Sequence, residues 1–148
     1  AHNVGSIFRT SDGAGVDKIY LVGPTPTPVD RFGRQQPEIK KTSLGASESV
    51  TWEHVGESDQ LSTAAAIECI NNLKDEDYQV VAIEQTEESV NIADFKPAEK
   101  VTYILGAEVE GVQPELIAAA DKVIERPMAG MKESLNVSVT AGIVLFHK

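Results

Sequence analysis

The sequence predicts an α/β fold in which helices flank a largely parallel sheet. Short apolar runs alternate along the chain with segments of helical spacing, and this alternation is typical of a parallel sheet. Three of the runs end in glycine or a polar residue, at Gly23, Glu84 and Gly106. Because ligands bind beyond the carboxyl ends of parallel strands, we expect a site near residues 83–86, 105–106 and 124–128.

The composition bounds the class of protein. The chain has 148 residues, about the size of one domain, and we expect residues 1–148 to form a single domain. Its single cysteine, Cys69, excludes a disulfide framework, and its three scattered histidines do not make a zinc site, so we expect no metal. We see neither a signal peptide nor a bilayer-length apolar run, and therefore expect a cytoplasmic protein without a membrane partner.

The first half of the chain predicts a helix, a strand and a long loop. Residues 3–16 have apolar anchors and glycines near their end, as helices closed by glycine do. The apolar run 18–23 ends in glycine and predicts a buried strand. The prolines that follow cannot continue a sheet or form a helix, so residues 24–37 are expected to be a loop. A short helix at 40–46 and a short strand at 50–52 complete this half.

The second half predicts the remaining strands and two helices. Residues 61–73 have apolar side chains at near-helical spacing and predict an amphipathic helix. Residues 114–120 predict another helix, with proline in its first turn. Strands are expected at 78–83, 101–106 and 122–124.

Periodicity alone leaves the structure of residues 132–146, the most apolar stretch, open between strand and helix. Its first half alternates apolar and polar residues, as strands do. The uncharged loop 127–131 precedes it, and Ser134 could cap a helix start while Asn136 hydrogen-bonds from the first turn. A loop that feeds a helix start offers backbone N–H groups to a ligand.

Three segments together resemble a known family. Residues 3–9 read Asn-x-Gly-x-x-x-Arg, residues 105–111 read Leu-Gly-x-Glu-x-x-Gly, and residues 128–138 read Met-x-Gly-x-x-x-Ser-Leu-Asn-Val-Ser. In this order they resemble the three motifs of the SpoU/TrmH-type RNA 2′-O-ribose methyltransferases of the SPOUT superfamily. The resemblance covers nearly the whole chain, and the fixed order of the motifs makes it specific.

The resemblance implies a fold and an activity. It implies that the C-terminal stretch is a helix threaded through a deep trefoil knot, that the protein is a homodimer, and that the family's first strand is missing before residue 1. It also implies an S-adenosylmethionine-dependent methyltransferase acting on a ribose 2′-hydroxyl of tRNA or rRNA. Two alternatives stay open: a catalytically silent RNA-binding or scaffold dimer on the same fold, and a SPOUT base methyltransferase. Arg9 and Asn136 argue against the first and the Ser-Leu-Asn triplet against the second.

The resemblance implies that S-adenosylmethionine lies in the knot loops, which include the loops at the carboxyl ends of three strands. The implied cofactor-binding residues are Ile83, Glu84, Gln85, Thr86, Leu105, Gly106, Ile124, Arg126, Met128, Ser134, Leu135 and Asn136. Glycine at 106 would let a backbone approach the cofactor closely, although it could equally be an ordinary strand-ending glycine. Arg126 departs from the family, which commonly has an aliphatic residue there.

The implied catalytic residues centre on Arg9. Asn3 would support it and Glu108 could orient it, while Ser134 and Asn136 would contact substrate or cofactor in addition to capping a helix. An arginine is charged at any working pH and is therefore a poor general base. It can more readily hold a phosphate and stabilise the developing 2′-oxyanion.

The net charge of −10 is the main objection to an RNA substrate, because nucleic-acid-binding proteins usually carry a basic excess. The chain must then concentrate its positive charge. Besides Arg9, we expect an RNA-binding loop with a stacking aromatic, made by Arg31, Phe32, Arg34, Lys40 and Lys41. The alternative is that this loop is only a solvated connection.

Overall fold

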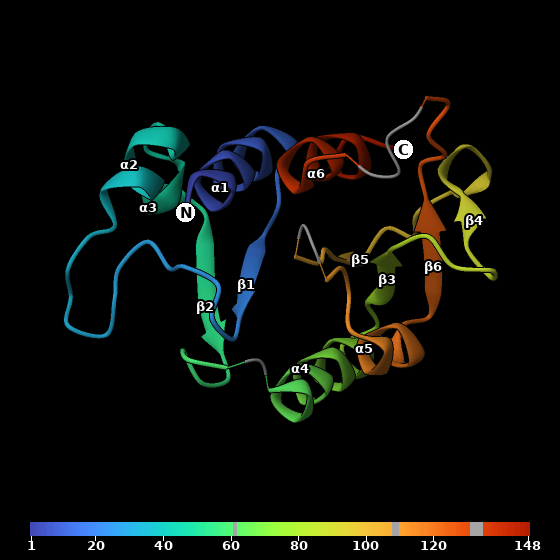
Figure 1. Cartoon of the computed structure of the whole chain (residues 1–148), viewed down its shortest axis with the longest axis horizontal. Coiled ribbons are helices and arrows are strands. Elements are labelled where there is room, and N and C mark those ends of the chain that lie inside the picture. Colours follow the sequence, from blue (N-terminus) through green and yellow to red (C-terminus); the bar gives the residue numbers. More distant parts are fainter. Residues whose placement is uncertain (61, 108–109, 131–134) are drawn as a thin grey trace. The chain divides into compact units, whose positions relative to one another are not determined.

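The structure is a computed structural model that describes residues 1–60, 62–107, 110–130 and 135–148. The chain divides into two compact units, each with its own parallel sheet. The N-terminal unit is Ala1–Ser62 with Ala141–Phe146, and the C-terminal unit is Thr63–Thr140 with His147–Lys148 (Figure 1). None of the helices in the described part of the chain has the length and apolar composition that crossing a bilayer requires.

The N-terminal unit combines a group of three helices with a two-stranded parallel sheet (Figure 1). Its elements are α1 (His2–Ala14), β1 (Lys18–Val22), α2 (Pro37–Ser43), α3 (Ala46–Ser49) and β2 (Thr51–Val55). Strand β1 pairs with β2, so that Lys18 faces Thr51 and Val22 faces Val55. Helix α1 packs against α2 and α3, and the core of the unit contains Phe8 and Ile39, both fully buried (Figure 1).

Helix α1 confirms the prediction for residues 3–16 and shows why it forms. Val4, Phe8 and Ser11 recur at helical spacing and are buried on one face. The helix ends at Gly15, which adopts a left-handed conformation with φ of 76° and bonds back to Asp12 and Ser11.

The C-terminal unit has a four-stranded sheet in the order β4-β6-β3-β5, and all its pairs are parallel. Its elements are α4 (Thr63–Asp75), β3 (Gln79–Ile83), β4 (Val90–Asn91), the 3₁₀ helix η1 (Ile92–Asp94), β5 (Val101–Ile104), α5 (Pro114–Ala119) and β6 (Lys122–Glu125). Strand β3 lies between β6 and β5, and its residues Val80, Val81 and Ala82 are fully buried. A continuous apolar run is expected of a strand buried on both faces.

The ambiguous C-terminal stretch is helical, as the family resemblance implied. Helix α6 (Val137–Leu145) buries Ala141 and Val144, three residues apart. Helical spacing therefore outweighs the alternating pattern of the preceding residues. The first residues of α6, up to Thr140, belong to the C-terminal unit, and the rest belongs to the N-terminal unit.

The parallel α/β class is confirmed, in the form of two sheets, while some element bounds differ from the prediction. The helix expected at 40–46 begins at Pro37, because proline is well suited to a first helical position, and ends at Ser43. Leu44 and Gly45 then take left-handed conformations that separate α2 from α3. Strand β4 and helix η1 were not predicted, because segments of two and three residues carry no readable periodicity. A single domain over residues 1–148 stays a prediction.

Candidate active site

The carboxyl ends of three neighbouring strands meet at one edge of the C-terminal sheet. In the parallel register Ala82 of β3 lies opposite Ile104 of β5, and Ile83 lies opposite Ile124 of β6. The loops that follow these strands therefore start side by side, at Glu84, Leu105 and Arg126 (Figure 1). They are the segments in which the cofactor-binding residues were predicted.

Glu84 connects the three strand ends. Its Oε2 accepts a hydrogen bond from the backbone N–H of Val112 at 2.9 Å, in the loop that follows β5. Its Oε1 accepts from the backbone N–H of Gln85 at 3.1 Å, and its own N–H donates to the carbonyl of Ile124 at 3.1 Å. The half-buried carboxylate is thus committed to holding the protein's own backbone.

Two glycines make the loop after β5 possible. A Cβ on Gly106 would come closer than 3.0 Å to the backbone of Gly111 and Val112. Gly111 has a left-handed φ of 69°, its N–H donates to Ala107 at 2.9 Å, and a Cβ there would collide with the Glu84 carboxylate. The glycines of Leu-Gly-x-Glu-x-x-Gly therefore close a tight turn against Glu84. Glu108, between them, lies outside the described residues.

The turn after β3 is held by its own side chains. The Ser89 hydroxyl donates to the Glu84 carbonyl at 2.8 Å and accepts from the Thr86 N–H at 2.8 Å. The side chain of Thr86 is half-buried and that of Gln85 is exposed. The polar side chains of this turn are thus largely engaged with one another and with the Glu84 backbone.

The remaining predicted cofactor residues differ in what they can offer a ligand. Ile124 has 1% of its surface exposed, and its carbonyl already accepts the Glu84 N–H, so it offers a ligand little surface. Among them, the side chains of Ile83, Leu105, Met128 and Leu135 are half-buried, whereas that of Arg126 is exposed.

Asn136 caps helix α6. Its Oδ1 accepts from the backbone N–H of Ser138 at 2.9 Å and from the Ser138 hydroxyl at 2.6 Å. An asparagine just before a helix whose side chain bonds the second helical N–H is an N-cap. Ser134, the other residue expected to cap this helix, lies outside the described residues.

The predicted catalytic arginine lies on α1 in the N-terminal unit. Arg9 is exposed, and among the described residues no hydrogen bond or ion pair engages it. Asn3 is half-buried on the same helix. Close packing of α1 against α2 explains the glycine at position 5, because a Cβ there would collide with Thr42 of α2. Arg9 and Asn3 belong to one unit and Gly106 and Asn136 to the other, so their meeting stays a prediction.

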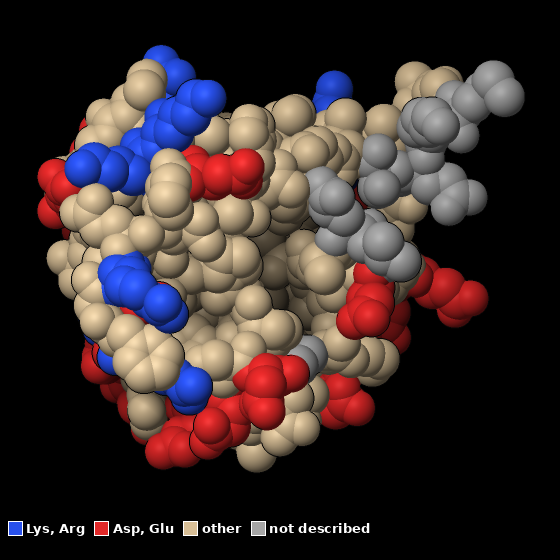
Figure 2. Space-filling model, turned by 60° about the vertical axis from the view of Figure 1, so that its left-hand side comes forward, with Lys and Arg blue, Asp and Glu red and all other residues tan. Residues whose placement is uncertain are grey.

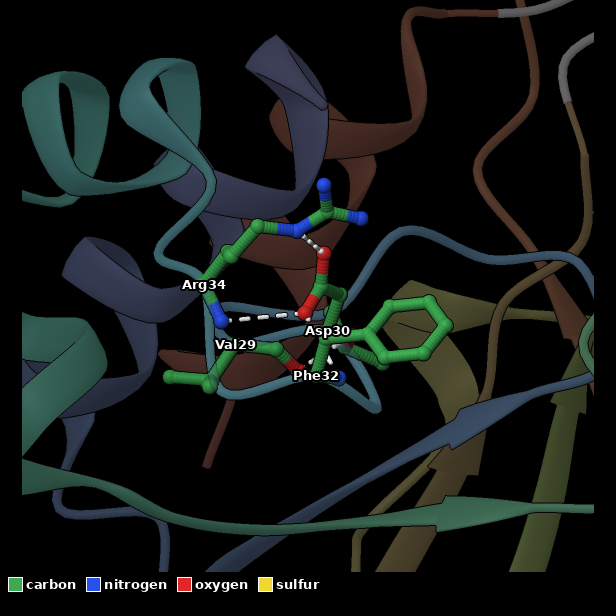
Figure 3. Close-up of polar contacts among 5 residues, drawn as sticks. Val29, Asp30, Phe32 and Arg34 are labelled. Atoms are coloured by element: carbon green, nitrogen blue, oxygen red, sulfur yellow. Dashed lines mark hydrogen bonds and ion pairs between the residues drawn. The ribbon is translucent and has the colours of Figure 1, made fainter.

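A carboxylate for which the sequence analysis predicted no role, that of Asp30, organises the loop after β1. Asp30 Oδ1 accepts from the N–H groups of Phe32 at 2.8 Å and Arg34 at 3.0 Å, and Oδ2 accepts from Arg34 Nε at 2.8 Å (Figure 3). These bonds, the Arg34 N–H first, hold the pKa of Asp30 below its usual 3.8. A signal was present in Asp-Arg-Phe-Gly, because Asp side chains bond the backbone two residues on and glycine allows left-handed turns.

The loop presents an aromatic ring between cations. Phe32 is 67% exposed, with the guanidinium carbons of Arg31 and Arg34 at 4.9 and 5.1 Å from its ring centroid. Lys40 donates to the Gln35 side chain at 3.2 Å, and Lys41 is exposed. Figure 2 shows Lys and Arg side chains gathered on one side of the view, next to a border of acidic side chains.

A pocket of about 400 Å³ opens beside this loop in the N-terminal unit. Its walls come from the loop and from β2, where His54 Nε2 donates to the carbonyl of Gly23 at 2.6 Å. The lining residues are Pro24, Thr25, Pro26, Thr27, Asp30, Arg31, Phe32, Arg34, Gln35, Gln36, Pro37, His54 and Ser58. Within the described part of the chain, no group of three or more His, Cys, Asp or Glu could hold a metal ion.

Comparison with known proteins finds relatives along the whole chain. The family model described as the SpoU rRNA Methylase family matches residues 1–146. An Aquifex aeolicus protein named tRNA (guanosine(18)-2′-O)-methyltransferase is 31% identical over 99% of this chain and 62% of its own length. The Escherichia coli 23S rRNA (guanosine-2′-O-)-methyltransferase RlmB is also 31% identical, over 99% of this chain and 54% of its length. The chain thus spans only part of these relatives.

Solved structures resemble this one over almost all its length. The A. aeolicus TrmH/SpoU tRNA modifying enzyme superposes with a TM-score of 0.77 at 31% identity, covering 99% of this chain and 66% of the other. An AdoMet-bound rRNA methyltransferase from Sinorhizobium meliloti superposes with a TM-score of 0.79 at 27% identity, covering 99% and 50%.

Proposed function

Because the chain belongs to the SpoU rRNA methylase family, we propose that it transfers a methyl group from S-adenosylmethionine to a ribose 2′-hydroxyl of tRNA or rRNA. The observation that carries this proposal is the family match over residues 1–146, which includes all three motifs. Relatives named as tRNA and as 23S rRNA 2′-O-methyltransferases support the ribose hydroxyl as the acceptor and leave both RNA classes open.

The carboxyl edge of the C-terminal sheet suits S-adenosylmethionine. The half-buried side chains of Ile83, Leu105 and Met128 provide apolar surface for an adenine ring. The hydrogen bond from the Val112 N–H to the Glu84 carboxylate fixes the loop that carries Leu105 and Gly106. The backbone groups of this loop are therefore positioned before a ligand binds. We also propose that α6 passes through these loops as the family's trefoil knot, with Ser134, Leu135 and Asn136 completing the pocket.

When bound, S-adenosylmethionine supplies a methyl group already activated by its sulfonium. The chain then has to position the ribose and stabilise charge as the 2′-oxygen loses its proton. In the proposal Arg9 does this, because its exposed guanidinium is not engaged by any other described residue. A guanidinium can hold a phosphate and the developing oxyanion at once, with Asn3 and Glu108 positioning it.

The RNA would be held by the loop that carries Arg31, Phe32 and Arg34 together with Lys40 and Lys41. We further propose a homodimer that acts in the cytoplasm. A two-fold dimer is the commonest assembly of soluble proteins and would let one subunit's Arg9 serve a site completed by the other.

The decisive experiment identifies the methylated atom. The protein is incubated with total RNA and S-adenosylmethionine labelled in the methyl group, and nuclease digests are analysed by mass spectrometry. The proposal expects label on a ribose, in a single tRNA or rRNA position. Label on a base would indicate a base methyltransferase, and RNA binding without any label would indicate a silent RNA-binding protein.

A further inference from the structure

The loop of residues 28–36 is built in advance. Its ends are joined where the Gln36 N–H donates to the Pro28 carbonyl at 2.9 Å, and Asp30 and Arg34 bond each other through both backbone and side chain. Preorganisation of this kind lowers the ordering cost that a flexible loop meets on binding. A merely solvated connection gains nothing from such bracing.

The two arginines beside the Phe32 ring, Arg31 and Arg34, differ in how firmly hydrogen bonds hold their guanidinium groups. Asp30 binds Arg34 through Nε, which leaves both terminal nitrogens of that guanidinium directed away from the carboxylate (Figure 3). For Arg31 no hydrogen bond or ion pair is found within the described residues, and its guanidinium lies over the Phe32 ring. Arg34 is therefore a fixed cation, and Arg31 can leave the ring for another partner without breaking a hydrogen bond.

The pocket is large enough for a small ligand, and polar residues are among those that line it. Its volume of about 400 Å³ falls in the range typical of ligand sites. Gln35 and Gln36 are among its lining residues, and a glutamine amide carries both donor and acceptor groups, although the Gln35 oxygen already accepts from Lys40. Nucleobase edges present that mixture, and Phe32 supplies a face on which a base can stack.

From these observations we propose that this pocket binds one unpaired nucleotide of RNA, with its base stacked on Phe32 and its phosphate held by Arg31 and Arg34. The proposal rests on the RNA substrate of the proposed function and specifies how that substrate is recognised. Arg31 would exchange the ring for the phosphate as the base arrives, while Asp30 keeps Arg34 in place.

The charge of the chain favours an unpaired nucleotide over a duplex. A duplex is held mainly by many cations along its phosphates, and a chain with a net charge of −10 is poorly suited to that. One aromatic face with two guanidiniums instead matches the stacking mode used for single strands. An acidic peptide would use the two guanidiniums but would leave the ring and the amides without a role.

The test measures binding of a fluorescein-labelled five-nucleotide RNA to the whole protein by anisotropy at low salt. A blunt RNA duplex and an acidic peptide serve as competitors. Phe32→Leu should weaken binding of the five-nucleotide RNA by about 5- to 150-fold, the usual effect of losing one stacked base, whereas Phe32→Trp should retain it. Because Phe32 is exposed, neither variant should alter thermal unfolding.

Changes at Asp30 distinguish its hydrogen bonds to the loop backbone from its ion pair with Arg34. Asp30→Asn keeps an oxygen for the backbone bonds but loses the ion pair with Arg34, so it should weaken binding less than Asp30→Ala does. Glu99→Ala, which removes a negative charge at an exposed position outside the loop, is the matched control and should have little effect.

Three results would overturn the proposal: unchanged affinity in Phe32→Leu, stronger competition by the duplex, or stronger competition by the acidic peptide. Failure of the methyltransferase proposal is recognised separately. Ribose methylation of total RNA together with Phe32-independent binding rejects only the pocket. Phe32-dependent binding without any methylation rejects only the enzyme.

Discussion

Replacing Glu84 with alanine tests whether this carboxylate holds the loops of the proposed cofactor site. The variant loses the acceptor for the Val112 N–H, which is buried, and for the Gln85 N–H, which is exposed. A hydrogen bond to a charged group contributes about 1.5–3 kcal/mol, and the exposed bond adds little, so we expect a loss of about 2 kcal/mol in the free energy of unfolding. Glu84→Gln keeps one acceptor oxygen and should lose about half as much.

The assay pairs urea unfolding, followed by circular dichroism, with titration calorimetry of S-adenosylmethionine binding. If the cofactor must reorder a loop that Glu84 no longer holds, its affinity should fall by up to about 30-fold, the equivalent of 2 kcal/mol. Glu87→Ala is the control, because it removes an exposed carboxylate of the same loop. If Glu84→Ala unfolds like the wild type but no longer binds S-adenosylmethionine, Glu84 does not act by holding the loops and is instead a direct cofactor ligand.

Three further predictions concern catalysis, pH and assembly. Arg9→Ala should leave unfolding and cofactor affinity unchanged, while the rate of single-turnover methyl transfer falls by about 10²–10³-fold. Arg9→Lys should also be slow, because an ammonium lacks the planar fork of a guanidinium. Wild-type turnover in Arg9→Ala would remove Arg9 from the mechanism. Because the pKa of Asp30 is lowered in the folded protein, its contribution to folding stability is fully present above the ordinary pKa of 3.8. That contribution is lost as the pH falls through the lowered pKa. Binding of the five-nucleotide RNA should therefore show no step from Asp30 between about pH 8 and pH 5, and a step there that disappears in Asp30→Asn would contradict the assigned contacts. Light scattering at micromolar concentration should give twice the chain mass of 15.9 kDa, and a monomer mass would count against the dimer.

The strands could be predicted because burial leaves a direct record in the sequence. β3 and β5 are mostly apolar, β6 has an apolar centre, and each lies within two residues of its predicted bounds. The start of α6 was ambiguous because apolar and polar residues alternate there, and only the family resemblance favoured a helix. The structure supplies the local reason, since Asn136 caps the first turn. Strand β4 is too short and too exposed to leave a pattern.

Contacts between distant residues were beyond the reach of the sequence. Nothing in the chain indicates that Glu84 would bond the N–H of Val112, 28 positions away. The turn that Asp30 builds was not predicted either, because counting charges cannot show which carboxylate builds a turn. Glu108 and Ser134 lie outside the described residues, so their predicted roles stay predictions.

The motif glycines and the motif arginine support different conclusions. Gly5 allows α1 to approach Thr42, and Gly106 and Gly111 allow a turn to close against Glu84. Each is explained by contacts within the chain, so these glycines would be needed even in a relative without activity. Arg9 is exposed and has no such structural role among the described residues. A silent RNA-binding relative would therefore lose nothing in stability by changing Arg9, and the presence of this arginine, more than that of any glycine, favours an enzyme.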